Sequence, residues 1–254
     1  PARGRHPYTP LYRMRMTPLI IIPARGGSKG IPRKNIKLLC GKPLIAYSID
    51  IAKAVCNKHN LTECNIILST DDDEIATMAE ACGLPVPYRR PESLATDTAG
   101  SREVILDAMD YADTNHIGYN CILLLQPTSP LRTADDVEGC LDLYEATHPD
   151  MVVSVKEAAA NPYYNCFETN PSNGMLQISK GDGLLSRRQD APKAWEFNGA
   201  VYVINPASIR QMPLGAFPAR IPYEMPTIRS VDIDTHLDWV IAETLMKQNQ
   251  TGKQ

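Results

Sequence analysis

The chain has 254 residues and a formal net charge of −3, with 43% hydrophobic and 22% charged residues. This composition supports a buried core and excludes a largely disordered chain. The longest purely aliphatic runs, residues 19–22 and 122–125, are far shorter than the about 20 apolar residues that a membrane-spanning helix requires. The sequence therefore predicts no membrane partner.

The basic residues are unevenly distributed along the chain. Residues 1–15 contain four arginines and no acidic residue, so the rest is more acidic than the total charge suggests. An acidic body disfavours nucleic acid as the main partner. The opening segment lacks the apolar stretch of a secretory signal, and we predict that residues 1–15 form a basic extension outside the fold.

The cysteines indicate a reducing compartment. Their number is seven, which is odd, and no pair has C-x-x-C spacing. A disulfide framework or a cysteine zinc site is therefore not expected. We predict a cytoplasmic location.

Strands and helices are predicted to alternate up to about residue 155. The series begins with a short apolar strand, and helices and strands follow in turn. Strands are expected at 19–23, 65–70, 121–125 and 151–155, and helices at 43–55, 72–82, 101–112 and 134–146. This alternation is typical of βαβ units and predicts an α/β fold with a mostly parallel, Rossmann-like sheet. Residues 16–155 would form a nucleotide-binding α/β core.

The regularity breaks at residues 156–196, where prolines and glycines are frequent and no periodicity persists. Such a stretch is typical of an insertion with short strands and exposed loops. Residues 197–254 would return to the core, with strands at 199–204 and 228–233 and a closing helix at 235–246.

A glycine-rich cationic segment follows the first predicted strand. Residues 24–35 read ARGGSKGIPRKN, with the cations Arg25, Lys29, Arg33 and Lys34. Glycine lets backbone N–H groups approach an anion closely, and the cations can neutralise a polyphosphate. The spacing matches neither a Walker A loop nor G-x-G-x-x-G. A solvated basic turn is the alternative, and the position after a strand favours phosphate binding.

Polar loops follow three more predicted elements. After 65–70 come Asp71, Asp72 and Asp73, of which the last two can cap the next helix, while a metal role for Asp71 is an alternative. Ser101 begins a helix and could read the edge of a polar heterocycle. The segment 126–132 reads QPTSPLR and favours a ligand loop, with Arg132 as a ligand or a structural partner.

The predicted strand 228–233 leads into a pair of acids. Residues two apart on a strand share a face, so Asp232 and Asp234 can present two carboxylates together. Two carboxylates with water and phosphate oxygens are a typical Mg²⁺ site. Asp234 could instead cap the closing helix. Since no protein nucleophile suggests itself, the parts indicate group transfer by positioning and charge neutralisation.

These segments together resemble the acylneuraminate cytidylyltransferases, the CMP-sialic acid and CMP-legionaminic acid synthetases. The matching motifs occur in order at residues 22–35, 69–71, 94–98, 126–132, 198–202 and 232–235, and the resemblance covers about residues 17 to 245. It implies a nucleotidyltransferase fold with a dimerisation arm at 156–196. It also implies that CTP activates a nine-carbon 2-keto sugar acid to its CMP-sugar, with release of pyrophosphate.

The same resemblance assigns roles to individual residues. The catalytic set would be Arg25, Lys34, Asp232 and Asp234, with the two aspartates holding Mg²⁺. Nucleotide-binding residues would be Arg25, Gly27, Ser28, Lys34, Asn35, Arg90, Ala99 and Ser101. Sugar-binding residues would be Gln126, Asn198 and, acting across a homodimer, Arg188.

Two departures from the bacterial sialic acid pattern concern the sugar. Tyr164 and Glu196 stand where a lysine and an arginine are often found, which points to a nonulosonate with an altered side chain, such as legionaminic acid. Alternatives are a cytidylyltransferase for the eight-carbon acid KDO, a glycosyltransferase using residues 71–73, and a non-catalytic nucleotide-sugar-binding module. The sequence identifies no general base.

Overall fold

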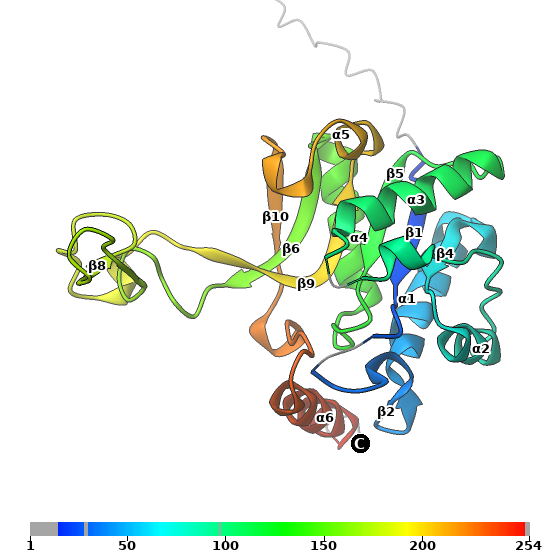
Figure 1. Ribbon diagram of the computed structural model, residues 1–254, viewed down its shortest axis with the longest axis horizontal. Helices are drawn as coiled ribbons and strands as arrows, with labels where there is room; N and C mark the ends of the chain where they lie inside the picture. Colours follow the sequence, from blue (N-terminus) through cyan, green and yellow to red (C-terminus); the bar gives the residue numbers. More distant parts are fainter. Residues whose placement is uncertain (1–14, 28–29, 97, 252–254) are drawn as a thin grey trace, which may run out of the picture.

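A six-stranded sheet forms the centre of the computed structural model, which describes residues 15–27, 30–96 and 98–251 (Figure 1). Its strands in chain order are β1 (Pro18–Pro23), β4 (Ile66–Ser69), β5 (Cys121–Leu125), β6 (Met151–Glu157), β9 (Trp195–Ile204) and β10 (Arg220–Glu224). They lie in the order β10-β6-β9-β5-β1-β4. Only β9 runs antiparallel to its neighbours. The expected mostly parallel α/β fold is confirmed.

Helices cover both faces of this sheet. The helices are α1 (Leu44–His59), α2 (Asp73–Ala81), α3 (Ser101–Thr114), α4 (Ala134–Thr147), α5 (Pro206–Gln211) and α6 (His236–Thr251). One side of β1, with Ile20 and Ile22, packs against α1, α2 and α4. The other side, with Leu19 and Ile21, packs against α3 and α5. Burial on both faces explains why β1 and β5 are continuous apolar runs without alternation.

A third apolar cluster lies under α6. Trp239 and Met246 of this helix pack with Ile31 from the glycine-rich segment and with Ile233 from the segment before the helix. Leu39 joins them from a small ribbon formed by β2 (Leu38–Leu39) and β3 (Lys42–Pro43). The closing helix therefore fixes the glycine-rich segment and the acidic segment on one shared support.

The insertion forms an arm between β6 and β9 that projects from the body (Figure 1). Its base is a two-stranded stem in which Glu157 pairs with Trp195. Its far end carries the hairpin of β7 (Phe167–Thr169) and β8 (Leu176–Ile178). The side chains of β7 are all exposed, so the hairpin has little core of its own.

Two expectations from the sequence need correction, and one strand was not predicted. The predicted strand 228–233 is wrong, because this stretch begins in a 3-10 turn (Thr227–Arg229) and continues without regular structure. The sheet is instead completed by β10, whose alternating exposure and internal Pro222 suit an edge strand. Arg15 belongs to the fold, since it donates to the carbonyl oxygens of His59 and Asn60. The rest of the proposed extension lies outside the described residues.

Within the described ranges, no helix is both long and apolar enough to cross a bilayer.

Candidate active site

Hydrogen bonds join the glycine-rich segment, which follows β1, to the end of the neighbouring strand β4. The backbone N–H of Ala24 donates to the Ser69 carbonyl at 2.8 Å, and that of Gly26 donates to Asp71 Oδ1 at 3.0 Å. The buried Asn35 amide donates to the Arg25 carbonyl at 3.1 Å. Asp71 therefore positions the loop through Gly26. Asn35 holds the backbone of Arg25 from the other side.

Two adjoining pockets open beyond the carboxyl ends of β1 and β5. The smaller, of about 260 Å³, is lined by residues that include Arg25, Arg90, Ala99, Ser101 and Gln126. The larger, of about 390 Å³, is lined by residues that include Arg25, Lys34, Asn35, Gln126, Thr128 and Asp234. Both share Pro23, Arg25 and Gln126, so a single extended ligand could occupy the two. Most of the predicted site residues are brought together here.

Arg90 forms a buried, positively charged wall of the smaller pocket. Its guanidinium donates to Ser69 Oγ at 2.9 Å and to the Ser69 carbonyl at 2.7 Å. Burial lowers the pKa of Arg90, partly offset by Tyr88 and Asp71. The side chain is therefore held rigidly, and its charge lies close to where a ribose or phosphate would bind.

The cationic loop and the acidic segment meet at the larger pocket. Lys34 Nζ lies 3.2 Å from Asp234 Oδ1 and also donates to the Ile233 carbonyl. The Ile233 N–H in turn donates to the Thr128 carbonyl at 2.8 Å. Segments almost 200 residues apart in the chain thus face the same space, as a shared binding site for a triphosphate requires.

Asp232 is more enclosed than Asp234, whose side chain is 75% exposed. Burial raises the pKa of Asp232, and the nearby charge of Asp234 adds to this rise, while the Thr128 hydroxyl and the charge of Lys34 oppose it. Its Oδ1 atom is buried and has no hydrogen-bond partner among the described residues. Gly199 permits this placement, since a Cβ there would lie 2.7 Å from Asp232 Oδ2.

These acids fit a divalent cation that other oxygens also coordinate. A buried carboxylate oxygen without a partner is costly unless a cation or a hydrogen-bond donor reaches it. Among the described residues no cluster of three or more His, Cys, Asp or Glu side chains could hold a metal by itself. Mg²⁺ commonly binds through one or two carboxylates, with water and substrate phosphates completing its shell.

Arg132 supports the loop after β5 and has a structural role. The side chain is 3% exposed and donates to the carbonyls of Gln126 at 2.6 Å and of Ser129 and Ala200 at 3.2 Å. Burial lowers the pKa of Arg132 to about 9. Of the two interpretations open at the sequence level, the structure supports the structural partner, because the guanidinium is occupied by carbonyls that shape the loop.

Four of the predicted site residues that the structure describes line neither pocket, namely Asp232, Asn198, Arg188 and Gly27. Asn198 is 2% exposed, and its amide is bonded to Ser154 and Ser230 in the core, so it joins β9 to neighbouring segments rather than facing a sugar. Arg188 lies in the arm and donates to the carbonyls of Ala158 and Ala159. Ser28 lies outside the described residues, and Gly27 has open space where a side chain would be.

Tyr202 lies on β9 within the motif at residues 198–202, and its phenol interacts with Gln126, a residue that lines both pockets. Burial raises its pKa, as does the charge of Asp232, while a hydrogen bond with Gln126 opposes the rise. The phenol thus lies between the acidic segment and the loop shared by both pockets. The signal available in the sequence was its place on the strand after Gly199, three residues beyond a forced turn.

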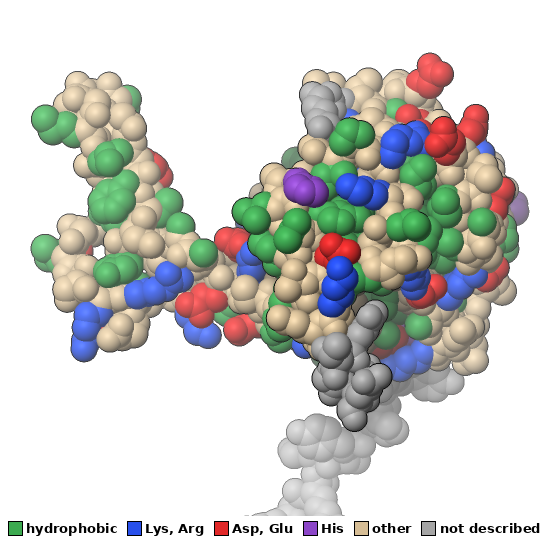
Figure 2. Space-filling model, turned by 90° about the horizontal axis from the view of Figure 1, so that it is seen from below, with side chains coloured by type: hydrophobic (Ala, Val, Ile, Leu, Met, Phe, Trp, Pro, Cys, Tyr) green, Lys and Arg blue, Asp and Glu red, His purple; other side chains and the backbone are tan. Residues whose placement is uncertain are grey.

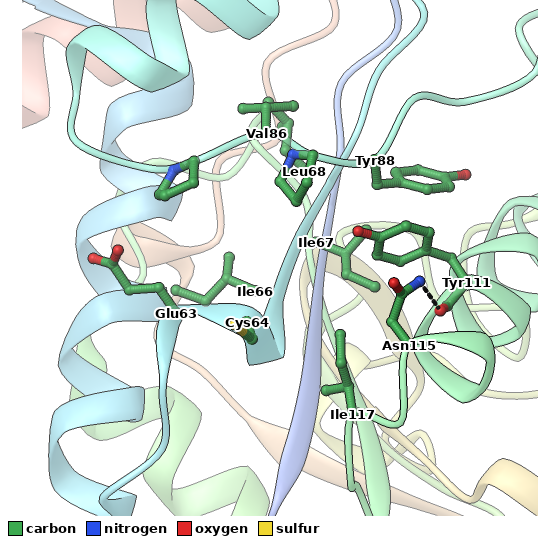
Figure 3. Close-up of a pocket in the computed structure, with 12 residues that line it drawn as sticks. Glu63, Cys64, Ile66, Ile67, Leu68, Val86, Tyr88, Tyr111, Asn115 and Ile117 are labelled. Atoms are coloured by element: carbon green, nitrogen blue, oxygen red, sulfur yellow. Dashed lines mark hydrogen bonds between the residues drawn. The ribbon is translucent and has the colours of Figure 1, made fainter.

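A further cavity of about 410 Å³ lies away from these groups, beside the edge strand β4 (Figure 3). Its walls are mainly apolar, with Ile66, Leu68, Val86 and the two rings of Tyr88 and Tyr111. No lysine or arginine lines it. A phosphate-bearing ligand would find no charge compensation there, so the paired pockets are the candidate active site.

Comparison with known proteins identifies the family of the chain. A family model described as cytidylyltransferase matches residues 19–249. The CMP-N,N'-diacetyllegionaminic acid synthase of Legionella pneumophila is 32% identical over 91% of this chain and 97% of its own length. The pseudaminic acid cytidylyltransferase of Campylobacter jejuni is 32% identical over 92% of this chain and 98% of its own.

Two more relatives differ in length or in sequence. An N-acylneuraminate cytidylyltransferase of Streptococcus agalactiae is 33% identical over 89% of this chain, but the match spans 52% of that protein. The structure of a CMP:2-keto-3-deoxy-manno-octonic acid synthetase complexed with CTP shares the fold, with a TM-score of 0.65 and 18% identity over 92% of this chain and 99% of that one. The chain belongs to the cytidylyltransferase family and is a nucleotidyltransferase.

Proposed function

We propose that this protein transfers the cytidylyl group of CTP to a nine-carbon 2-keto sugar acid and releases pyrophosphate. The observation that carries the proposal is the meeting of Lys34 and Asp234 at a pocket that adjoins a second, nucleotide-sized one. The relatives named for legionaminic, pseudaminic and N-acylneuraminic acids support the same substrate class.

The two pockets suit the two ends of the nucleotide. Arg90, Ala99 and Ser101 would surround the cytosine and ribose in the smaller pocket. Lys34, Asn35 and Gly30 would hold the triphosphate in the larger one. Arg25 lines both pockets, and this places its charge near the α-phosphate, where the bond to pyrophosphate breaks.

Asp232 and Asp234 would hold Mg²⁺. When bound, the cation neutralises phosphate charge and lowers the pKa of a coordinated hydroxyl. Asp234 already accepts from Lys34, so its negative charge keeps the ammonium group at the mouth of the pocket. Gln126 is shared by both pockets and would orient the sugar acid for in-line attack on the α-phosphorus.

The sugar acid is proposed to be of the legionaminic type. Glu196 pairs with Lys156 at 2.7 Å in the stem of the arm, which leaves this part of the stem without a net positive charge. Tyr164 likewise supplies no cation. A substrate side chain with amide or methyl groups would be better accommodated than one that requires two cationic partners.

The arm is proposed to pair two copies into a homodimer, with Arg188 serving the partner's sugar site. Large apolar side chains of the arm are exposed, among them Leu184 at 82% and Leu176 at 72% (Figure 2). Such exposure is costly in water and marks a surface that another protein chain covers. A cytoplasmic location fits a CTP-dependent reaction and a chain whose cysteines are free.

A pyrophosphate-release assay tests the proposal. The purified chain is supplied with CTP and one sugar acid at a time, from a panel of N,N'-diacetyllegionaminic, pseudaminic, N-acetylneuraminic and eight-carbon KDO acids, with and without Mg²⁺. We expect Mg²⁺-dependent release that is greatest with the legionaminic acid. Preference for KDO would support the eight-carbon alternative, and no release with any acid would support a binding module.

A further inference from the structure

The phosphate-binding loop, residues 24–35, is joined to the start of α2 by an ion pair. Arg33 Nη1 lies 2.6 Å from Asp72 Oδ2, and the other guanidinium nitrogen pairs with Glu74. Arg33 has a left-handed backbone, with φ of 56°, a conformation that costs a non-glycine residue energy. The Arg33 side chain extends from the turn to the start of α2, so its ion pair with Asp72 helps to fix the end of the loop.

The two carboxylate oxygens of Asp72 make different interactions, one with the backbone of α2 and one with Arg33. Oδ1 accepts the backbone N–H groups of Glu74 at 2.9 Å and Ile75 at 3.0 Å, which caps α2. Oδ2 receives the short bond from Arg33. Burial opposes ionisation, but the Arg33 guanidinium and the capping bonds hold the pKa of Asp72 below its ordinary value. The carboxylate is therefore anchored by the helix and available to the loop.

The same oxygen borders the other end of the loop. A Cβ added to Gly26 would lie 2.5 Å from Asp72 Oδ2. Gly26 is also held by its N–H bond to Asp71. Asp72 thus contacts the loop immediately after Arg25 and immediately before Lys34, the two cations assigned to the triphosphate.

We propose that Arg33 and Asp72 are a positioning pair that holds the described parts of the loop on either side of residues 28–29, at Gly26 and at Arg33, so that Arg25 and Lys34 are presented to the nucleotide. Neither residue of the pair lines either pocket, so it acts through its chain neighbours. This inference rests on the proposed function for its kinetic test, because CTP is the ligand whose binding reports the loop.

The variant Asp72→Asn separates positioning from capping. An asparagine Oδ1 caps a helix as well as aspartate does, but its NH₂ group would face the Arg33 guanidinium, donor against donor. Arg33→Gln removes the pair from the other side. For each variant we expect KM for CTP to rise about 5- to 20-fold, with kcat and KM for the sugar acid within about twofold. The double variant should be no worse than the more affected single one.

Arg210→Gln is the matched control. Arg210 is as exposed as Arg33 and likewise pairs with two carboxylates, Asp110 and Asp113, but it lies on α5 away from the pockets. This change should leave KM for CTP within about twofold of the wild-type value. A purely structural role for the Arg33–Asp72 pair would lower the unfolding temperature of the variants without altering KM for CTP, and that result would overturn the inference.

Hydrogen exchange without nucleotide distinguishes failure of this inference from failure of the proposed function. In Asp72→Asn the backbone amides of Gly26 and Lys34 should exchange at least about fivefold faster than in the wild type, while those inside α2 keep their rates. If the wild-type chain activates no sugar acid, the proposed function fails, but the exchange rates still show whether the Arg33–Asp72 pair positions the loop. Unchanged exchange at both amides would refute the inference.

Discussion

Around β1, β4 and β5 the polar side chains find their partners within the same chain, whereas along the arm most side chains face solvent. Arg90 and Arg132 are buried on carbonyl and hydroxyl oxygens of neighbouring segments. In the arm, Arg188 donates to the carbonyls of Ala158 and Ala159 at the base of the arm, and Leu184 is 82% exposed. One region is preorganised by a packed sheet, and the other presents groups that a second molecule would complete.

This difference separates two kinds of mutational effect. A change near β1 or β5 should act within the subunit that carries it, because the partners are local. A change in the arm should act on a neighbouring subunit, if the arm serves the partner as we propose. The predictions below test that separation, beginning with the largest expected effect.

Replacing the buried acid of the core should have the largest effect. Asp232→Asn removes the charge of the carboxylate whose Oδ1 is buried without a partner. We expect kcat to fall at least about 10³-fold, since both the cation and its charge neutralisation would be lost. Pyrophosphate release at saturating CTP and Mg²⁺ measures this.

The same variant should remain folded. Burial raises the pKa of Asp232, so the charged form is disfavoured in the folded state and a neutral amide relieves that cost. Asp232→Asn should therefore unfold at the same temperature as the wild type or higher. Near-normal turnover at saturating Mg²⁺ would show that the acid does not hold the cation.

Mixing two inactive or impaired variants should restore activity if Arg188 acts across the dimer. Arg188→Ala should raise KM for the sugar acid about tenfold or more while leaving KM for CTP unchanged, since the residue bonds to the base of the arm and lines neither pocket of its own chain. Combined in equal amounts with Asp232→Asn and allowed to exchange subunits, it should regain about one quarter of the wild-type sites. If no activity is recovered, Arg188 does not serve the partner's site: it acts in the site of its own subunit or has no role in the sugar site.

Asn198→Ala should affect stability more than chemistry. The Asn198 amide bonds to Ser154 Oγ at 2.6 Å and to Ser230 Oγ at 2.9 Å in the core. Truncation leaves both hydroxyls with a lost partner, and we expect the free energy of unfolding to fall by about 1–3 kcal/mol. Denaturant unfolding measures this change. A large rise in KM for the sugar acid without loss of stability would instead make Asn198 a substrate ligand.

Most of the sheet could be predicted because its central strands are apolar runs. The conformation of the acidic segment could not, because its sequence is compatible with a strand or with an irregular segment. Residues 19–22 and 122–125 are apolar throughout, as strands covered on both faces must be. The β10 strand was missed because its alternate residues are exposed and Pro222 interrupts it. The expected meeting of Asp234 with the cationic loop is seen in its ion pair with Lys34, but the segment is not a strand, and Asp232 is half-buried while Asp234 is exposed.

The polar residues of the site were harder to assign than its cations. Lys34 could be recognised because glycines and further cations surround it, and these serve few purposes other than anion binding. Asn198 has the same chemistry as a sugar ligand, and only its 2% exposure shows that it bonds inside the core. Burial of a polar side chain depends on which segments pack over it, here those with Ser154 and Ser230, and a linear sequence does not state this.

The smallest expected effect is a pH dependence confined to the core acid. Because burial raises the pKa of Asp232 in the folded state, the folded protein takes up this proton at a higher pH than the unfolded chain does. Between those two pKa values, falling pH stabilises the wild type relative to Asp232→Asn. The stability advantage of the variant at neutral pH should therefore shrink as the pH is lowered towards the ordinary aspartate value. Urea unfolding of both proteins across this range measures the difference, and a constant gap would mean that Asp232 keeps an ordinary pKa.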